Sequence, residues 1–373
     1  MKTKKLLSVA MLWALLAAAN QTYAQGSAAD FLNVLRLEAR ADFEFDHLHT
    51  HTFGPMGSGL LDENPYGFSG KYFNIHMGGD LGGGFTYYYR QRIVANGGSV
   101  KFFDNTDFLY LNYVANKNWS FRLGKDALTV GGYEYDAAPI DVLFNGYYWD
   151  WYYCFQLAAS AAYHSNNGNH TLMFQVATSP YSHTGSAYGE KNLLAYNLYW
   201  SGNMKHFHTL YSIGVFEREQ GTFVGNVALG NKLVYDKWDW YVDLMSRCTS
   251  TSQLTSNWSV ISRLGIHAND NLTVFVKGGY EQNKNEEEWD AYVNGDLPWD
   301  CLAMPGQTFG FYGAGVEYRP AKCKDVRFHA FVANFETGNA TTTDNAYTDV
   351  DLRVNVGLTW NMNILKMLNK VKK

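Results

Sequence analysis

Two stretches near the ends of the chain alternate between apolar and polar residues without a break. From Leu35 to Asp46 the odd positions hold Leu, Leu, Ala, Ala, Phe and Phe, and every even position is charged. From Val350 to Trp360 the even positions are apolar, and the odd positions hold Asp, Arg, Asn, Gly and Thr. Because successive side chains of a β-strand point to opposite faces, each stretch predicts a strand with one apolar and one polar face.

The length of the first stretch favours a membrane strand. Strands of soluble sheets usually run about 5–6 residues, whereas a tilted strand that crosses a bilayer needs roughly 9–11. A chain that begins and ends with such strands can pair the first with the last and close a barrel.

Similar alternating segments recur along the whole chain and predict about sixteen strands. The even number agrees with the rule for bacterial outer-membrane barrels. The predicted strands are 34–46, 70–80, 85–94, 107–115, 119–126, 148–163, 170–178, 192–201, 206–217, 225–234, 238–247, 258–266, 272–280, 307–318, 326–334 and 349–360.

The connections between these strands are short and long in turn. Those after even-numbered strands are brief and rich in Gly, Asn and Asp, while most of those after odd-numbered strands are long. Outer-membrane barrels have short periplasmic turns and long extracellular loops. The fold class predicted is therefore an all-β, transmembrane antiparallel β-barrel over residues 25–360, with both termini in the periplasm of a bacterial outer membrane.

The two ends of the chain lie outside the predicted barrel. Residues 1–24 have the three parts of a cleaved signal peptide: lysines, a short apolar core, and small residues before Gln25. Residues 361–373 form a basic, mildly amphipathic periplasmic tail, with a helix on the inner leaflet as the alternative. The mature chain has no run of 18 apolar residues, which excludes a helical membrane protein.

Composition agrees with a barrel and argues against a nucleic-acid partner. The chain holds 27 Tyr, 23 Phe and 11 Trp, and clusters such as Tyr87–Tyr89 and Tyr147–Trp149 suit the aromatic girdles of outer-membrane barrels. Aromatic packing in a β-sandwich is the alternative. Without residues 1–24 the chain has 27 basic and 35 acidic residues, which gives a net charge of −8. Such a charge does not attract nucleic acid.

Four cysteines, Cys154, Cys248, Cys301 and Cys323, match no zinc-site spacing. Cys248 and Cys301 fall in neighbouring outer loops, where they could form a disulfide; four free thiols are the alternative.

In a barrel, the polar side of each strand faces the lumen. Charges of both signs then line the pore, which suits small hydrophilic solutes and gives weak ion preference; inward salt bridges that stiffen the wall are the other interpretation. The residues expected inward are Arg36, Glu38, Arg40, Asp42, Glu44, Asp46, Arg90, Arg92, Arg122, Asp126, Asp243, Arg263, Lys277, Glu317, Arg327 and Asp351.

Part of the chain resembles a known family. A hairpin around Gly79–Gly83 is followed by Phe108–Tyr113 and by Phe121-Arg122-Leu123-Gly124-Lys125, then by Gly132 and Glu134. This order resembles the phosphate-selective porin O and P family. The resemblance implies a sixteen-stranded porin, usually a homotrimer, that passes small solutes passively. Phosphate binding in that family depends on gathered Lys and Arg side chains, which the constriction candidate of this chain lacks.

That candidate is the loop 127–147, the third outer loop, which general porins fold into the barrel. Gly131-Gly132 permits a sharp bend, and Glu134, Asp136 and Asp141 occur with no Lys or Arg. A folded-in acidic loop would favour cations or neutral solutes; an ordinary surface loop is the alternative. The predicted pore-lining set is Arg36, Arg40, Arg90, Arg92, Arg122, Lys125, Asp126, Glu134, Asp136 and Asp141.

Other chemistry is weakly supported. His47, His49 and His51 share one face of an extended strand and could bind a metal, but solvated rim residues are the simpler interpretation. No hydrolase, zinc-protease or phosphate-loop motif occurs where its fold requires it, although loop residues such as His183 and Ser186 could be combined at a rim.

We therefore expect a porin, not an enzyme, that needs no cofactor and contacts membrane lipid and small solutes or ions. A barrel whose outer loops act as an adhesin or structural element is the alternative, with a rim-located hydrolase less favoured.

Overall fold

The computed structural model describes residues 31–51, 66–93, 102–151, 154–183, 193–248, 255–286, 303–339 and 348–371. Sixteen strands occur in these ranges: β1 Val34–His51, β2 Tyr66–Gly82, β3 Phe85–Arg92, β4 Thr106–Val114, β5 Trp119–Ala127, β6 Phe155–His164, β7 His170–Thr178, β8 Leu194–Met204, β9 Phe207–Glu219, β10 Thr222–Tyr235, β11 Trp238–Cys248, β12 Asn257–Asn269, β13 Leu272–Asn283, β14 Gln307–Tyr318, β15 Val326–Asn339 and β16 Thr348–Asn363.

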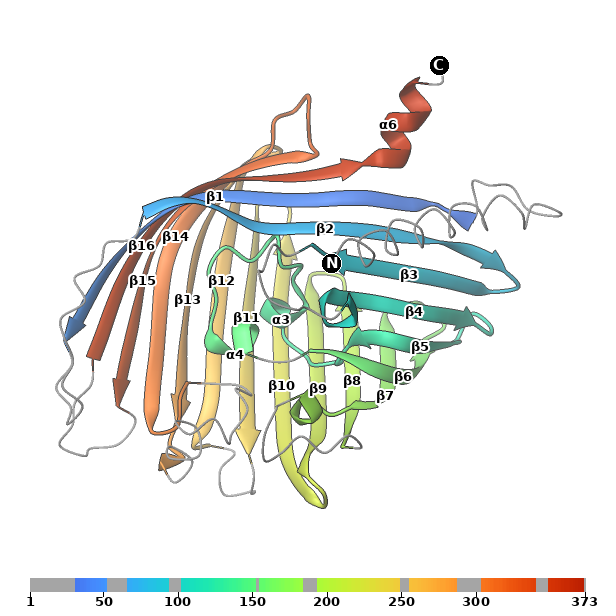
Figure 1. Cartoon of the computed structure of the whole chain (residues 1–373), viewed down its shortest axis with the longest axis horizontal. Coiled ribbons are helices and arrows are strands. Elements are labelled where there is room, and N and C mark those ends of the chain that lie inside the picture. The colour runs from blue at the N-terminus through green and yellow to red at the C-terminus, as the bar shows by residue number, and fades with distance from the viewer. Residues whose placement is uncertain are drawn as a thin grey trace, which may run out of the picture.

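The strands form one closed antiparallel barrel, as the sequence predicts (Figure 1). Each strand pairs with its sequence neighbours, and β1 pairs with β16 to close the ring. The two alternating stretches lie side by side at the closure: Phe43 is opposite Val356 and Asp42 is opposite Gly357. Matching apolar residues with apolar partners sets this register, because a slip by one residue would move every side chain to the other face.

Burial separates the two faces of the wall as the alternation predicts. On β16 Val356 is 58% exposed, whereas Asn355 beside it is 1% exposed. The exposed side carries Leu, Val, Phe and Trp from nearly every strand, and the buried side carries most of the charged and amide side chains. Apolar side chains outside and polar ones inside are the arrangement of a barrel surrounded by lipid.

The described ranges also contain five short helices: η1 Phe102–Asn105, α3 Tyr133–Asp136, α4 Tyr147–Trp151, η2 Pro180–His183 and α6 Ile364–Val371. No helix in these ranges is both long enough and apolar enough to span a membrane. In Figure 1, α3 and α4 lie among the barrel strands, and α6 extends from the end of β16.

The prediction of a strand over 148–163 is wrong at its beginning. Residues 147–151 form helix α4, and the strand starts at Phe155. The cause is a tertiary contact: Glu281 of β13 accepts backbone hydrogen bonds from Tyr147 and Tyr148, which fixes the first turn of a helix. Tyr148 is 2% exposed, so this ring is interior and does not belong to a lipid-facing girdle.

Candidate functional site

Segment 128–147, which follows β5, contacts the polar faces of distant strands. Its first turn lies against β9, where the Gly131 N–H donates to Ser212 Oγ at 2.8 Å and the Gly132 N–H donates to the Leu210 carbonyl at 3.1 Å. Gly132 has a φ of 103°, which favours glycine strongly. The predicted bend at Gly131-Gly132 is thus present.

Two carboxylates of the barrel wall accept hydrogen bonds from the first backbone N–H groups of helices α3 and α4. Asp243 of β11 accepts the backbone N–H groups of Tyr133 at 2.9 Å and Glu134 at 2.7 Å, at the start of α3. Glu281 does the same for α4. The first N–H groups of a helix have no partner within it, and a carboxylate also interacts well with the helix dipole. Both carboxylates are fully buried, so each fixes one end of the segment.

Glu134 and Lys277 form a buried ion pair between the segment and β13. Glu134 Oε2 lies 2.5 Å from Lys277 Nζ and accepts a hydrogen bond from the Tyr241 hydroxyl at 3.2 Å. The Gly146 N–H donates to the other carboxylate oxygen at 3.1 Å. Lys277 also donates to the Phe144 carbonyl. A buried pair with its remaining polar atoms satisfied is costly to break.

Arg327 and Arg40 hold the far part of the segment. Arg327 of β15 pairs with Asp141 at 2.5 Å and donates to the Ile140 carbonyl. Arg40 of β1 donates to the Val142 carbonyl at 2.6 Å while it pairs with Asp42. The segment therefore touches β9, β11, β13, β15 and β1 in turn.

Apolar contacts add to these polar ones. Phe144 of the segment packs at ring-centroid distances of 5.1 to 6.3 Å against four phenylalanines that lie on the buried face of the wall. These partners are Phe275, Phe311, Phe331 and Phe335. A second cluster joins Leu128, Val130 and Tyr148 to small wall residues, among them Ala177, Ala195 and Ala228.

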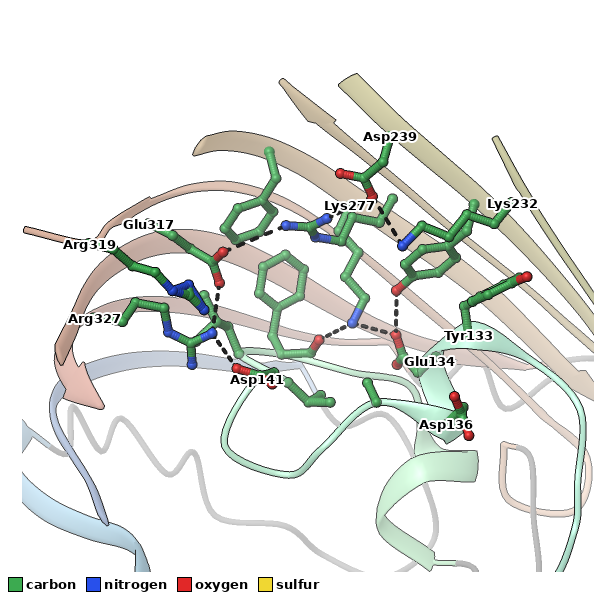
Figure 2. A pocket seen from close by; sticks show the side chains of 17 residues that line it. Tyr133, Glu134, Asp136, Asp141, Lys232, Asp239, Lys277, Glu317, Arg319 and Arg327 are labelled. Carbon is green, nitrogen blue, oxygen red and sulfur yellow. Dashed lines mark hydrogen bonds and ion pairs between the residues drawn. The ribbon is translucent and has the colours of Figure 1, made fainter. Parts of the chain in front are cut away.

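A cavity of about 470 Å³ lies between the segment and the wall. Figure 2 shows acidic side chains of the segment on one side and basic side chains of β10, β13 and β15 on the other. The residues that line it include five basic and five acidic ones: Lys232, Arg263, Lys277, Arg319 and Arg327, and Glu134, Asp136, Asp141, Asp239 and Glu317.

The three acids predicted for the constriction differ in their surroundings. Glu134 and Asp141 are neutralised by Lys277 and Arg327. Asp136 makes no ion pair within the described residues, and the surrounding protein raises the pKa of its carboxyl above the usual value by removing part of its hydration. Its side chain still has accessible surface, because it faces the cavity.

The arginines predicted from β1, β3 and β5 are partnered on the wall near their own strands. Arg36 pairs with Glu38 at 3.0 Å. Arg90 and Arg92 share Asp107 at 2.9 and 2.7 Å, and Arg122 pairs with Asp126 at 2.7 Å. Except for Arg40, none of these arginines has a described contact with segment 128–147, so they are separate from the cavity.

Lys125 differs from its prediction as a pore-lining residue. It is in register with Leu109 of β4 and Leu157 of β6, and both leucines are exposed on the outer side, at 43% and 64%. Lys125 shares their face and donates to the Phe103 carbonyl. Phe121 and Leu123 are also exposed on the outer side, and strand alternation from these two residues assigns position 125 to the same face.

Several cavity residues were absent from the predicted pore-lining set. Arg263, Lys277 and Arg327 were expected inward by parity but were not connected to the loop. Lys232, Asp239 and Arg319 had no assignment, although Asp239 has the parity of the buried Tyr241 and Asp243. Alternation alone therefore places Asp239 on the inner face, but it does not predict that this residue lines a cavity beside the segment.

Cys154, Cys248 and Cys323 are free thiols, so Cys248 forms no disulfide; Cys301 is outside the described residues. No group of His, Cys, Asp or Glu within the described ranges is arranged to hold a metal ion. The side chains of His47, His49 and His51 and residue Ser186 are outside the described part, so the predictions that concern them stay predictions.

Substitution of Gly131 by alanine should loosen the segment. A Cβ at this position would lie 2.4 Å from the Leu210 carbonyl oxygen, which belongs to the backbone of β9 and cannot move aside. We expect overpacking of about 1–3 kcal/mol, seen as a lower unfolding temperature in heat-modifiability gels. The matched control is Gly70→Ala, where no atom lies within 4 Å of the added Cβ; equal unfolding temperatures for the two variants would contradict the packing.

Comparison with known proteins agrees with the barrel. The family model of the phosphate-selective porins O and P matches residues 62–228. No curated protein matches the chain. Among solved structures, the outer membrane channel DcaP of Acinetobacter baumannii is similar with a TM-score of 0.58 and 13% identity, covering 88% of this chain and 97% of that one.

Two other solved structures are similar at the level of the fold. An anion-selective porin from Comamonas acidovorans has a TM-score of 0.56 and 11% identity, covering 88% of this chain and 98% of its own. OprB of Pseudomonas putida has a TM-score of 0.57 and 10% identity, covering 88% and 94%. The chain therefore has the fold of outer-membrane porins, a closed barrel of sixteen strands, and over residues 62–228 it is similar to the family of phosphate-selective porins O and P.

Proposed function

We propose that the protein is a passive diffusion channel for small hydrophilic solutes and ions, and that segment 128–147 is its constriction. The observation that carries the proposal is topological. The segment leaves the barrel wall at the end of β5, and β13 is eight strands away in either direction around the ring. Contacts from this segment to Lys277 and Glu281 on the polar side of β13 support a path of the segment across the lumen.

We also propose the orientation and assembly expected from the sequence. The short turns and both termini face the periplasm, the long loops face outward, and residues 1–24 are removed. Trimer formation is carried over only from the resemblance to the family. The family and the fold point to a channel rather than an enzyme.

The charges around the cavity favour weak selectivity. Five basic and five acidic side chains line it, and rings of mixed sign give little preference for either ion. The Comamonas porin is described as anion-selective, but the balanced lining does not favour extending that property to this chain. Size exclusion beside the segment is then the main filter.

The test is single-channel conductance of the refolded mature protein in a planar bilayer, with the reversal potential measured across a salt gradient. Stable conductance with a reversal potential near zero is expected. No conductance from a heat-modifiable barrel would overturn the channel proposal. A reversal potential close to that of an ideal anion pore would overturn the weak selectivity while leaving the channel intact.

Protonation of Asp136 should change this selectivity. Because its pKa is raised, the carboxyl takes up a proton at a higher pH than an ordinary aspartate, whose value is about 3.9. Cation permeability should therefore fall as the pH is lowered, with a step above that value. Asp136→Asn should abolish the step and should behave at neutral pH as the wild type does in acid.

Asp236→Asn is the control for this titration, because Asp236 is an exposed acid in the turn between β10 and β11. The control should keep the step. Retention of the step in Asp136→Asn would assign it to another lumen carboxylate.

A further inference from the structure

Helix α6 continues directly from the last barrel strand. β16 ends at Asn363 and α6 begins at Ile364, so no linker separates them. The Asn363 side chain accepts a hydrogen bond from the Lys366 N–H at 2.9 Å, which is the geometry of an N-cap. The helix therefore starts at a fixed place on the rim of the barrel.

The helix is amphipathic and its apolar side lacks a full cover. Apolar residues recur at Ile364, Met367, Leu368 and Val371, which is the spacing of one helix face. Met367 and Leu368 are each 51% exposed. The packing contacts of α6 are with β1, and the helix projects away from the barrel wall (Figure 1).

The surroundings of α6 indicate what covers these side chains. Leu358 and Trp360 lie near the end of strand β16 and are exposed on its outer face. The helix therefore begins where the lipid-facing band ends. Lys366 is exposed, Lys370, Lys372 and Lys373 follow in the sequence, and no acidic residue follows Asp351. A basic amphipathic helix next to a lipid-facing surface fits an anionic membrane interface.

We propose that α6 lies on the periplasmic leaflet of the outer membrane, with Met367 and Leu368 among the acyl chains and Lys366 at anionic headgroups. This assignment rests on the proposed orientation of the barrel. The helix would fix the depth and tilt of the closing strands β16 and β1, because the chain passes into it without a linker.

The test places a fluorescent probe on each side of the helix in the full mature barrel. The four native cysteines are replaced by serine, and Leu368→Cys or Lys366→Cys is labelled with an environment-sensitive dye. The protein is then reconstituted in phosphatidylethanolamine–phosphatidylglycerol vesicles. Lipids spin-labelled on the upper part of the acyl chain should quench the dye at 368 roughly threefold more than the dye at 366, because the apolar face of such a helix sits roughly 5–10 Å into the interface.

Each other outcome has a defined meaning. Equal quenching at the two positions, with water-like emission, would overturn the proposal. A dye at 368 that is shielded but not quenched would also overturn it, since protein and not lipid would then cover the helix. If the dye at 368 is quenched as strongly in vesicles without phosphatidylglycerol as in vesicles with it, the part of the proposal that places Lys366 at anionic headgroups is overturned. Conductance of Leu368→Gln is measured in parallel and should equal that of the wild type, so a failed channel and a failed helix contact are distinguishable.

Discussion

Replacement of Asp243 and Glu281 by alanine in one protein should raise the single-channel conductance and admit larger sugars. Each carboxylate accepts backbone N–H groups at the start of one short helix of segment 128–147. Loss of one such cap costs about 0.5–2 kcal/mol, and the pair together about 1–4 kcal/mol. Short helices of four and five residues have little stability of their own, so the segment should leave its place on the wall for part of the time.

Conductance traces and liposome swelling with sugars of increasing size measure this effect. We expect frequent transitions to a larger conductance level and a higher size limit, with a heat-modifiable barrel that resembles the wild type. Asp239→Ala is the matched control: it lies on the same face of β11, but its described partners are Lys232, Arg263 and His267 of the wall. An unchanged size limit in the double variant would mean that the segment does not restrict the pore.

The sequence predicted the barrel well because alternation and turn chemistry are local properties. All sixteen predicted strands overlap the observed ones, and the pairing of β1 with β16 follows from two faces that match residue by residue. The predicted and observed strand boundaries differ most where a residue distant in the sequence contacts the end of a strand. Tyr147 and Tyr148 favour a strand by composition, but the hydrogen bonds to Glu281 make this stretch a helix.

The site was predicted less well because its contacts join residues far apart in the sequence. Phe309-Gly310-Phe311 on β14 breaks the rule that apolar means lipid-facing: both phenylalanines are buried, on the side that packs with Phe144. Aromatic residues on the polar parity are a local sign that something apolar packs against the buried face of the wall. Which segment supplies it depends on side-chain packing across the barrel, and alternation carries no information about that.

The same limit explains why the loop looked acidic. Glu134, Asp136 and Asp141 were judged without their partners, and two of them are neutralised by Lys277 and Arg327, which follow them by more than a hundred positions. Parity placed both cations in the lumen, but the pairing depends on how the segment lies across β13 and β15. Net charge along one loop is therefore a poor guide to the field in a pore.

Reversal of the charge at Arg319 should shift the channel toward cations. Arg319 lines the cavity and forms no ion pair within the described part of the chain, so in the proposed channel its charge would face the passing ions. In water at about 5 Å, one unit charge changes the energy of a passing ion by about 0.8 kcal/mol. Arg319→Glu changes two charges, which after screening by salt leaves about 1 kcal/mol for each ion, or about fivefold in the permeability of the cation, while the permeability of the anion changes the opposite way.

The reversal potential under a salt gradient measures this change, and salt should weaken it. Lys322→Glu is the matched control, because it makes the same charge change in the same turn at a residue that does not line the cavity. Asp136→Lys should shift the ratio the opposite way, toward anions, since Asp136 lines the same cavity from the segment. Equal shifts from Arg319→Glu and Lys322→Glu would mean that the general field at the channel mouth sets the preference and that ions do not pass through the cavity beside segment 128–147.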